Sequence, residues 1–331
     1  MNQLTNPAKL PTMKRFWTTL ALFAAYQSWA CCGVGAGRVY FGGQQDIVIW
    51  DDSTQTEHFV RKASFQSASS EMGFIAPSPS VPELKAVSTR AFRTVEDHRP
   101  VPVPMAAAAS EAAMSKAAVA GGIEVAQIVE VGNYEATTLR ADDPAALTSY
   151  LNQNGYQASP DIEEWTQFYL KKKWYLTAFK LKQKRERTEL EPIRMSFKTD
   201  RPFFPYLVPA SNRGKPAKLQ VFLLSAGIGS ATAEGVVLPK PSWDAPLSPG
   251  AVPGLLDDLT LPPGALDHSM HITGWDDLQF PSSATDDGYL HIHSIRPFWL
   301  DLGAYALVGF AGVYGYRRFR LARSKQKVAT D

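Results

Sequence analysis

The sequence predicts an α+β fold, mainly an antiparallel sheet with two short helices, plus one C-terminal transmembrane helix. Three patterns support this class: several segments alternate apolar and polar residues, two segments repeat apolar residues at helical spacing, and residues 298–316 form a long apolar run. At 331 residues with 45% hydrophobic content, the chain can bury a full core.

Two pairs of neighbouring strands are predicted early in the chain. Residues 46–50 and 57–65 flank a polar turn, and residues 123–131 and 134–140 flank a Gly-Asn turn. Alternation with a period of two is what a half-buried strand requires, and short polar turns join antiparallel neighbours. Residues 219–225 add one more predicted strand.

Two helices are predicted between these strands. Asp143 is placed to cap the first helix, with Pro144 at its first position and Gly155 as its stop. Residues 160–171 predict the second helix, because their apolar residues, Trp165 among them, fall on one face.

The densest aromatic cluster follows the second helix. Residues 174–181 and 192–198 both alternate and are separated by a charged connection, so we expect them to form an antiparallel hairpin. After the second strand, Pro202 and Pro205 exclude a helix and favour an extended segment packed by aromatic rings.

Both ends of the chain carry membrane-related patterns. Residues 1–30 have a basic start, a short apolar run and small residues near Ala30, which predicts a signal peptide cleaved after that residue. Residues 298–316 predict a transmembrane helix, and the basic residues 317–331 predict a cytoplasmic tail. This topology places the protein in the cytoplasmic membrane as a single-pass protein with an extracytoplasmic (periplasmic) domain.

The predicted organisation between these ends is one split domain with linkers. Its parts are a first half over residues 31–98, a Pro/Ala-rich linker over 99–122, a second half over 123–226, a Pro/Gly-rich tether over 227–266, and a juxtamembrane segment with an edge strand over 267–296.

Four sequence blocks carry a family resemblance. The blocks GGQQDIVIWDDSTQTEHFVRKASF, GFIAPSPSVPEL, WYLTAFKL and RMSFKTDRPFFPY occur in this order. Together they resemble the bacterial envelope family catalogued as domain of unknown function 2330, over about residues 31–226. The resemblance implies a secretion signal, often a C-terminal membrane segment, and no assigned activity. This chain differs from the family pattern in its adjacent cysteines and its alanine-rich insert.

Charge and cysteine usage exclude some classes of protein. A formal net charge of +2 argues against nucleic-acid binding, which favours a strongly basic domain. The two cysteines, Cys31 and Cys32, cannot form a disulfide framework or a cysteine-rich zinc site. They leave open a lipidated Cys31, a strained disulfide between neighbours, a bond between chains, or free thiols.

No familiar catalytic motif occurs in the chain. GxSxG, HExxH and GKS/GKT patterns are absent from the sequence. The adjacent aspartates are expected at turns and caps, and Lys171 to Lys173 at a solvated helix end. The aspartate pairs are Asp51-Asp52, Asp142-Asp143, Asp257-Asp258, Asp276-Asp277 and Asp286-Asp287.

Four of the six histidines gather late in the chain, at His268, His271, His291 and His293. On a strand, residues two apart share a face, so His291 and His293 can reach one metal ion, and His271, His268 or Asp267 can complete a zinc or copper site. The alternative is that these histidines are solvated or packed without a metal.

Two functions follow from these observations. The leading expectation is a membrane-anchored extracytoplasmic binding or scaffold module of the bacterial envelope, with enzymatic activity left open but not favoured and with no cofactor. Its partners would be the lipid bilayer and an envelope protein or ligand that the sequence does not identify. The alternative is an envelope metal-binding protein or metalloenzyme that uses the four histidines.

Overall fold

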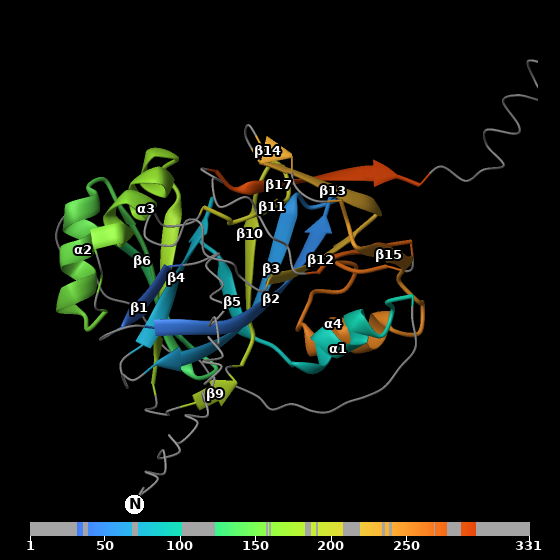
Figure 1. Ribbon diagram of the computed structural model, residues 1–331, viewed down its shortest axis with the longest axis horizontal. Coiled ribbons are helices and arrows are strands. Elements are labelled where there is room, and N and C mark those ends of the chain that lie inside the picture. Colours follow the sequence, from blue (N-terminus) through green and yellow to red (C-terminus); the bar gives the residue numbers. More distant parts are fainter. Residues whose placement is uncertain are drawn as a thin grey trace, which may run out of the picture.

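An eight-stranded sheet, mixed in strand direction, runs through the middle of the molecule (Figure 1). Its order is β15 (Trp243–Pro246), β16 (His271–Trp275), β12 (Leu219–Ser225), β2 (Val39–Asp51), β3 (Thr56–Ser67), β10 (Ile193–Lys198) and β5 (Glu83–Ala86), with β9 (Arg187–Glu189) paired to β3. Strands β2 and β12 pair in parallel, whereas their other neighbours are antiparallel.

Two smaller antiparallel sheets pack against this central sheet. The five-stranded sheet has the order β1 (Cys32–Gly35), β4 (Met72–Ser78), β8 (Tyr175–Leu181), β7 (Tyr134–Ala141) and β6 (Ile123–Val131). The four-stranded sheet has the order β11 (Phe203–Phe204), β17 (Gly288–Ser294), β13 (Gly227–Ala233) and β14 (Val236–Val237). Side chains from all three sheets meet in one buried hydrophobic cluster.

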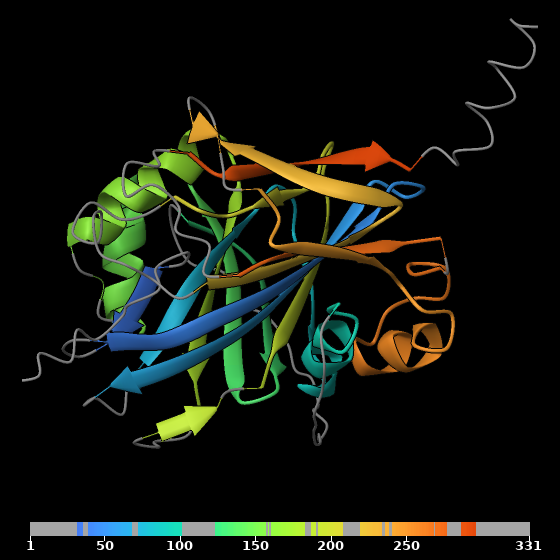
Figure 2. The same ribbon diagram turned by 45° about the vertical axis from the view of Figure 1, so that its right-hand side comes forward.

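Four helices cover the outer faces in two pairs, as Figures 1 and 2 show. Helices α1 (Arg90–Glu96) and α4 (Val252–Asp258) lie on one face of the central sheet and share a second buried cluster with it. Helices α2 (Pro144–Gln153) and α3 (Pro160–Lys171) cover the five-stranded sheet and bury Trp165 and Tyr169 in a third cluster.

The computed structural model describes residues 32–35, 39–67, 72–100, 123–156, 158, 160–182, 187–189, 191–207, 219–233, 236–237, 240–267, 269–276 and 286–295. The predicted signal peptide (residues 1–30), most of the Pro/Ala-rich linker, the predicted transmembrane helix (298–316) and the predicted tail (317–331) lie outside these residues.

Covering on both sides explains why β2 is apolar from Ile47 to Trp50. Ile47 and Ile49 point toward α1 and α4, and Val48 points toward the other sheets. All three side chains are fully buried. A strand buried on both faces becomes a continuous apolar run instead of an alternating one.

Local chemistry sets the helix and turn that the sequence predicted. The Asp143 side chain accepts hydrogen bonds from the backbone N–H groups of Ala145 and Ala146 at 3.3 and 3.0 Å, and Pro144 opens α2. Gly132 adopts a φ of +52° in the turn between β6 and β7. That backbone conformation favours glycine, because a Cβ is strained there. The predicted hairpin over residues 123–140 and both predicted helices are confirmed.

The predicted fold class, α+β with two short helices and a transmembrane helix, was wrong. The described residues form mainly β-sheet, with four helices, and the central sheet includes a parallel pair. None of the helices in the described part of the chain is long and apolar enough to cross a bilayer. The class was misjudged because the strands after residue 226 are short and rich in glycine and small polar residues, so their alternation is weak.

The predicted hairpin of residues 174–181 and 192–198 was also wrong. Both strands exist, but β8 lies between β4 and β7, and β10 lies between β3 and β5. The two strands therefore belong to different sheets. Alternation shows that a segment is a strand and does not identify its neighbour, which burial of the whole sheet decides.

The predicted tether over residues 227–266 is folded. It contributes β13, β14, β15 and α4, and Leu255 of α4 and Leu259, just after the helix, are fully buried. Proline is compatible with this helix because Pro253 lies in its first turn, where backbone N–H groups have no partner within the helix. The domain therefore does not end near residue 226, and the predicted edge-strand segment also joins it as β16 and β17.

Candidate functional site

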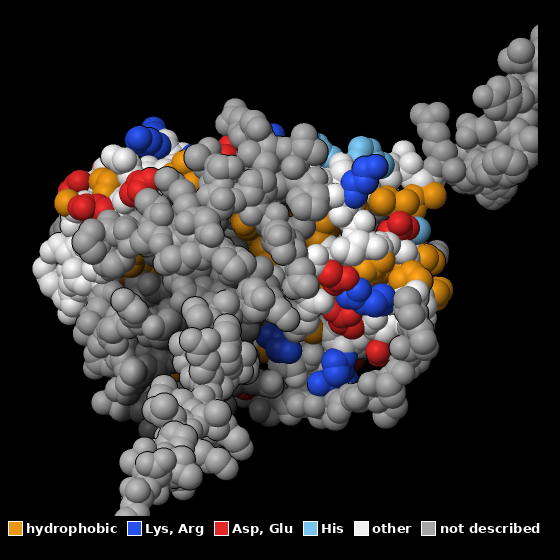
Figure 3. Space-filling model, in the orientation of Figure 1, with side chains coloured by type: hydrophobic (Ala, Val, Ile, Leu, Met, Phe, Trp, Pro, Cys, Tyr) orange, Lys and Arg blue, Asp and Glu red, His pale blue; other side chains and the backbone are white. Residues whose placement is uncertain are grey.

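Strand β17 brings two of the four predicted metal ligands together. His291 and His293 are both exposed on one face of β17, and their Nε2 atoms lie 2.7 Å from the hydroxyls of Thr232 and Ser230 on β13. Pale blue histidine atoms lie at the top of the surface in Figure 3, over these strands.

The other two predicted ligands do not join them in the described structure. His271 lies on β16 in the central sheet, paired with Ser225 and Pro246, and His268 lies outside the described residues. Within the part of the chain that the structure describes, no three His, Cys, Asp or Glu side chains are grouped to hold a metal ion. The zinc or copper site stays a prediction.

Strand β17 is paired along one edge only for much of its length. On one side it pairs with β13 from Tyr289 to Ser294, and on the other it pairs with β11 only at Gly288 and Tyr289. The backbone N–H of Leu290 donates to the Pro202 carbonyl on the β11 side at 3.0 Å.

The backbone of the outer half of β17 has no described partner on that side. Because backbone groups alternate in direction along a strand, the N–H groups of Ile292 and Ser294 point the same way as that of Leu290. No described strand pairs with them there. Figures 1 and 2 show this half of β17 running beside β13. We call residues 291–295 the β17 tip.

A buried carboxylate holds the opposite end of the strand. Asp287, which is fully buried, accepts hydrogen bonds from the Tyr169 hydroxyl of α3 at 2.7 Å and from the Tyr206 backbone N–H at 3.2 Å. The Lys172 ammonium lies 3.3 Å from its other oxygen. Asp287 therefore joins the start of β17 to α3 and to the segment after β11. We call Glu57, Tyr169, Lys172, Asp286 and Asp287 the root cluster.

Lys172 is enclosed by aromatic rings and carboxylates. Its ammonium lies 4.0 Å from the centre of the Phe168 ring and 4.9 Å from that of Trp174. It also donates to the Tyr289 hydroxyl at 3.2 Å and to Asp286 at 3.3 Å. This lysine is a structural cation of the root cluster, not the solvated helix end that the sequence predicted.

Glu57 reaches the same region from the central sheet. This residue of β3 is fully buried, and its Oε2 accepts the backbone N–H of Phe203 at 2.9 Å. Its Oε1 is buried without a hydrogen-bond partner among the described residues. The short strand β11 and the residues after it therefore lie between two buried carboxyls, Glu57 and Asp287.

Burial dominates the electrostatics of the root cluster. It raises the pKa of Glu57 well above its usual 4.5, against a lowering by the Phe203 N–H, and the charge of Asp287 raises it further. Burial also raises the pKa of Asp287, although Lys172 opposes this. Burial lowers the pKa of Lys172, but Asp287 and Tyr289 raise it more, so its pKa lies above the usual value. These directions fit a charged Lys172, and they hold Glu57 closer to its neutral form than a solvent-exposed glutamate.

Another buried carboxyl, that of Asp46, lies between the central and five-stranded sheets. Asp46 of β2 is fully buried, receives a hydrogen bond from the Gln44 amide, and pairs across the sheet with Arg61. Arg61 donates to Gln44 at 2.7 Å and lies 5.4 Å from the centre of the Phe74 ring. Burial raises the pKa of Asp46 from 3.8 to about 7, against a lowering by Arg61.

Comparison with known proteins assigns the chain to a family. The family model described as "Uncharacterized protein conserved in bacteria (DUF2330)" matches residues 24–235. The chain belongs to this family. The matched region includes Glu57, Tyr169 and Lys172, and it ends before Asp287 and β17.

The other comparisons of this DUF2330 chain provide no evidence about its fold or function. No curated protein matches it. One solved structure, the 2.7 Å crystal structure of a mutated baculovirus P35 after caspase cleavage, aligns over 76% of this chain and 94% of its own, at 9% identity and a TM-score of 0.32. A likeness at that TM-score supports no argument about fold or function.

One histidine and serine pair in the DUF2330 chain invites comparison with a catalytic dyad. His58 Nδ1 lies 2.8 Å from the Ser196 hydroxyl, on neighbouring strands. Burial and the charge of Arg194 lower the pKa of His58 to about 4, so its ring is neutral near pH 7. Its Nε2 is buried with no hydrogen-bond partner among the described residues, so no described carboxylate orients the ring as in a triad.

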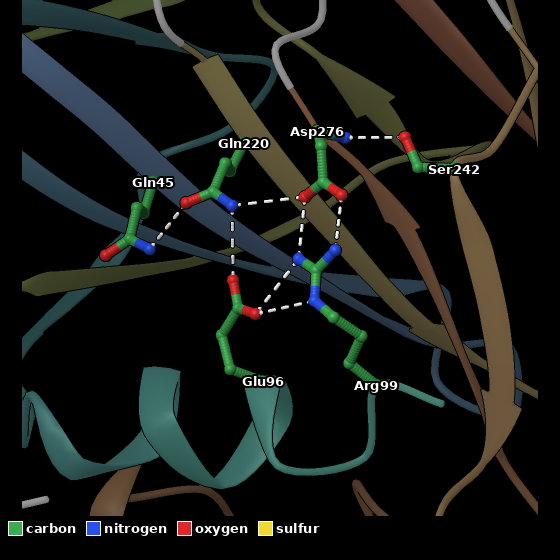
Figure 4. A network of polar contacts seen from close by, with 6 residues as sticks. All are labelled: Gln45, Glu96, Arg99, Gln220, Ser242 and Asp276. Atoms are coloured by element: carbon green, nitrogen blue, oxygen red, sulfur yellow. Dashed lines mark hydrogen bonds and ion pairs between the residues drawn. The ribbon is translucent and has the colours of Figure 1, made fainter. Parts of the chain in front are cut away.

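A polar network ties the end of α1 to the central sheet (Figure 4). Arg99 binds Asp276 through both terminal nitrogens and donates to Glu96 at 3.0 Å. The guanidinium also lies 5.1 Å from the Trp243 ring centre. Hydrogen bonds from Arg99 and then from Gln220 lower the pKa of Asp276. The drawn residues are Gln45, Glu96, Arg99, Gln220, Ser242 and Asp276. Both carboxylates of the network bind Arg99, so we interpret it as a structural clamp.

Sequence reasoning missed the root cluster entirely. Asp51 and Asp143 do lie at a turn and a cap, as expected of paired aspartates. Asp286 and Asp287 instead lie in the interior, both less than a tenth exposed. The one hint was Tyr169, a tyrosine on the apolar stripe of α3, because a buried hydroxyl needs a polar partner.

Proposed function

We propose that the protein is an exported, non-enzymatic binding or scaffold module of the bacterial envelope, and that its partner adds an extended strand to the β17 tip. One observation carries this proposal. Ile292 and Ser294 direct backbone N–H and carbonyl groups to an edge where no described strand pairs with them. Such an edge is a template for strand addition.

The build of β17 suits this role. Its inner half is locked by the root cluster and by pairing with β11, so the tip is held in an extended conformation before a partner arrives. A rigid, preformed edge reduces the entropy lost on binding. Ser294 and Ile295 are exposed and available to contact a partner strand.

The buried carboxyls support a binding role over catalysis. Asp46, Glu57 and Asp287 have the raised carboxyl pKa values expected of acid–base residues, yet all three are fully buried. A catalytic acid or base must reach the proton that it transfers. We therefore assign these three carboxyls a structural role inside the fold and not a catalytic one.

Export rests on the sequence of residues 1–30 and on a bacterial family. We expect the mature chain to begin at Cys31 and to lie on the extracytoplasmic side of the cytoplasmic membrane. Mass spectrometry of the N-terminal peptide from fractionated cells tests this. A protein retained in the cytoplasm with residues 1–30 intact would contradict it. The proposal includes no transmembrane helix.

Strand addition is tested by removing one backbone donor at the open edge. Ser294→Pro deletes an N–H that points to this edge, and Ser294→Ala is the matched control because it keeps the N–H. A photo-crosslinking amino acid at Ile295, which is 44% exposed, reports a bound partner in living cells. The same crosslinker at Val81, which is 42% exposed in the loop between β4 and β5, is the site control.

We expect a defined envelope protein, identified by mass spectrometry, to crosslink at Ile295 but not at Val81. The adduct should persist in Ser294→Ala and be lost in Ser294→Pro. An adduct of equal yield in both variants would show that the edge N–H plays no part. Absence of any adduct at Ile295 would also contradict strand addition.

A further inference from the structure

We propose that Glu57, beside Asp287, is protonated in the folded protein and that this proton keeps β11 and the start of β17 packed against the central sheet. Loss of the proton would release the start of β17, which we call its root. This inference deepens the proposed function, because it makes presentation of the β17 tip depend on pH. We call the protonated Glu57 side chain, with its hydrogen bond from the Phe203 N–H, the latch. The latch can be tested without any partner.

The latch acts on the weakest pairing in the four-stranded sheet. Strand β11 contributes only Phe203 and Phe204, paired with Tyr289 and Gly288. On β3, the Glu57 side chain accepts a hydrogen bond from the backbone N–H of Phe203, the first residue of β11, at 2.9 Å. The Asp287 side chain accepts one from the backbone N–H of Tyr206, two residues after β11, at 3.2 Å. Two buried carboxyls therefore replace a longer run of strand pairing.

The charges around Glu57 favour its neutral form over its ionised form. Asp286 and Asp287 already present two carboxylates to one lysine, Lys172, at 3.3 Å from each. An ionised Glu57 would add a third negative charge with no further cation among these groups. Its Oε1 has no described donor to stabilise a charge. A neutral Glu57 avoids both costs.

The remaining titratable and charged groups near the root cluster do not change this balance. Tyr169 donates its hydroxyl to Asp287, and burial raises the pKa of Tyr206, so the Tyr206 hydroxyl stays neutral near pH 7. Tyr289 shares its hydroxyl with Lys172. Arg201 lies 3.6 Å from the centre of the Tyr289 ring but is itself exposed, so its charge is screened by solvent.

The direction of the pH dependence follows from the raised pKa of Glu57. Above about pH 4.5 an opened root would release the proton, whereas the docked root retains it. The stabilisation is therefore complete below that pH and is lost as pH rises through the docked-state pKa. Across this window, the equilibrium constant for opening should rise about tenfold per pH unit.

Hydrogen exchange of the full chain measures the opening directly. Peptides covering β11 and β17 are followed from about pH 5 to about pH 9, and rates are corrected for the intrinsic pH dependence of exchange. Strands β7 and β8 of the five-stranded sheet serve as internal references. Glu57→Gln keeps a carbonyl acceptor for the Phe203 N–H but cannot ionise. Glu163→Gln, an exposed site on α3, is the matched control.

We expect opening of β11 and β17 to increase with pH in the wild type and in Glu163→Gln, and to increase clearly less in Glu57→Gln, where only the raised pKa of Asp287 still contributes. If the buried amide prevents folding, Glu57→Met provides a second non-ionisable side chain of similar length and should show the same reduced slope. A slope as steep as that of the wild type in either Glu57 variant would overturn the latch. A flat profile in the wild type would overturn it as well.

The crosslink at Ile295 separates the latch from the proposed function. If adduct yield falls with pH more steeply in the wild type than in Glu57→Gln, the latch controls partner binding. If exchange shows the slope but adduct yield is equal at every pH, the regulatory link is wrong although the latch exists. If no adduct forms at any pH, strand addition is wrong, and the exchange data still decide the latch.

Discussion

Asp46 provides the sharpest stability test of the interior. Asp46→Asn replaces a fully buried carboxyl with a neutral side chain of nearly the same shape, next to the Gln44 amide and across from Arg61. The substitution should change how stability depends on pH more than it changes stability at acidic pH, where Asp46 is already neutral.

The magnitude follows from the pKa of Asp46, which burial raises from 3.8 to about 7. At about 1.4 kcal/mol per pH unit, holding an ionised Asp46 inside the protein costs about 4 kcal/mol. A carboxyl whose folded-state pKa is raised stabilises the fold fully below about pH 4 and loses that contribution as pH rises through about 7. Arg61 reduces this cost but does not cancel it.

Urea unfolding at a series of pH values, followed by tryptophan fluorescence, measures the effect. The free energy of unfolding of Asp46→Asn, minus that of the wild type, should increase by about 4 kcal/mol between about pH 4 and about pH 8. This difference cancels the contributions of other buried carboxyls. Asp244→Asn, at an exposed position of β15, should show no such increase. An Asp46→Asn profile parallel to the wild type would refute the reasoning.

Three further predictions concern backbone geometry and capping, and each is read as a shift in the urea midpoint. Gly73→Ala should destabilise the protein by about 2 kcal/mol or more, because its Cβ would lie 2.0 Å from the Phe179 carbonyl oxygen on β8; wild-type stability would mean that β4 can move away from β8. Gly254→Ala, in α4 with no atom within 4 Å of the new Cβ, should instead stabilise by about 1 kcal/mol, and a loss would contradict the open space there. Asp143→Ala should cost about 1 kcal/mol by removing the α2 cap, whereas no change would mean that solvent replaces the cap.

The parts of the fold that the sequence predicted depend on neighbouring residues. Helix α2 begins where Asp143 can cap it, and the β6–β7 turn forms where Gly132 can adopt a positive φ. Helix α3 follows the spacing of its apolar residues. These features are decided within a few positions of chain, so composition and spacing are enough to locate them.

The errors occurred where a decision depends on distant residues. Alternation located β8 and β10, but their assignment to different sheets follows from how three layers share one core. Residues 227–266 resembled a tether because glycine and proline are common there, yet Leu255 and Leu259 find a core supplied by β2 and α1. Pairing and burial are properties of the assembled sheets.

The amino-acid sequence by itself determined the family, about half of the described strand and helix positions, and the local caps and turns. Only the tertiary structure decided which carboxyls matter. Glu57 comes from a strand early in the chain and Asp287 from a paired aspartate near its end, and neither is distinctive alone. Their shifted pKa values arise because folding removes water from both and places them on either side of β11. Desolvation and proximity exist only after the chain has folded, and for that reason the root cluster was invisible in the sequence.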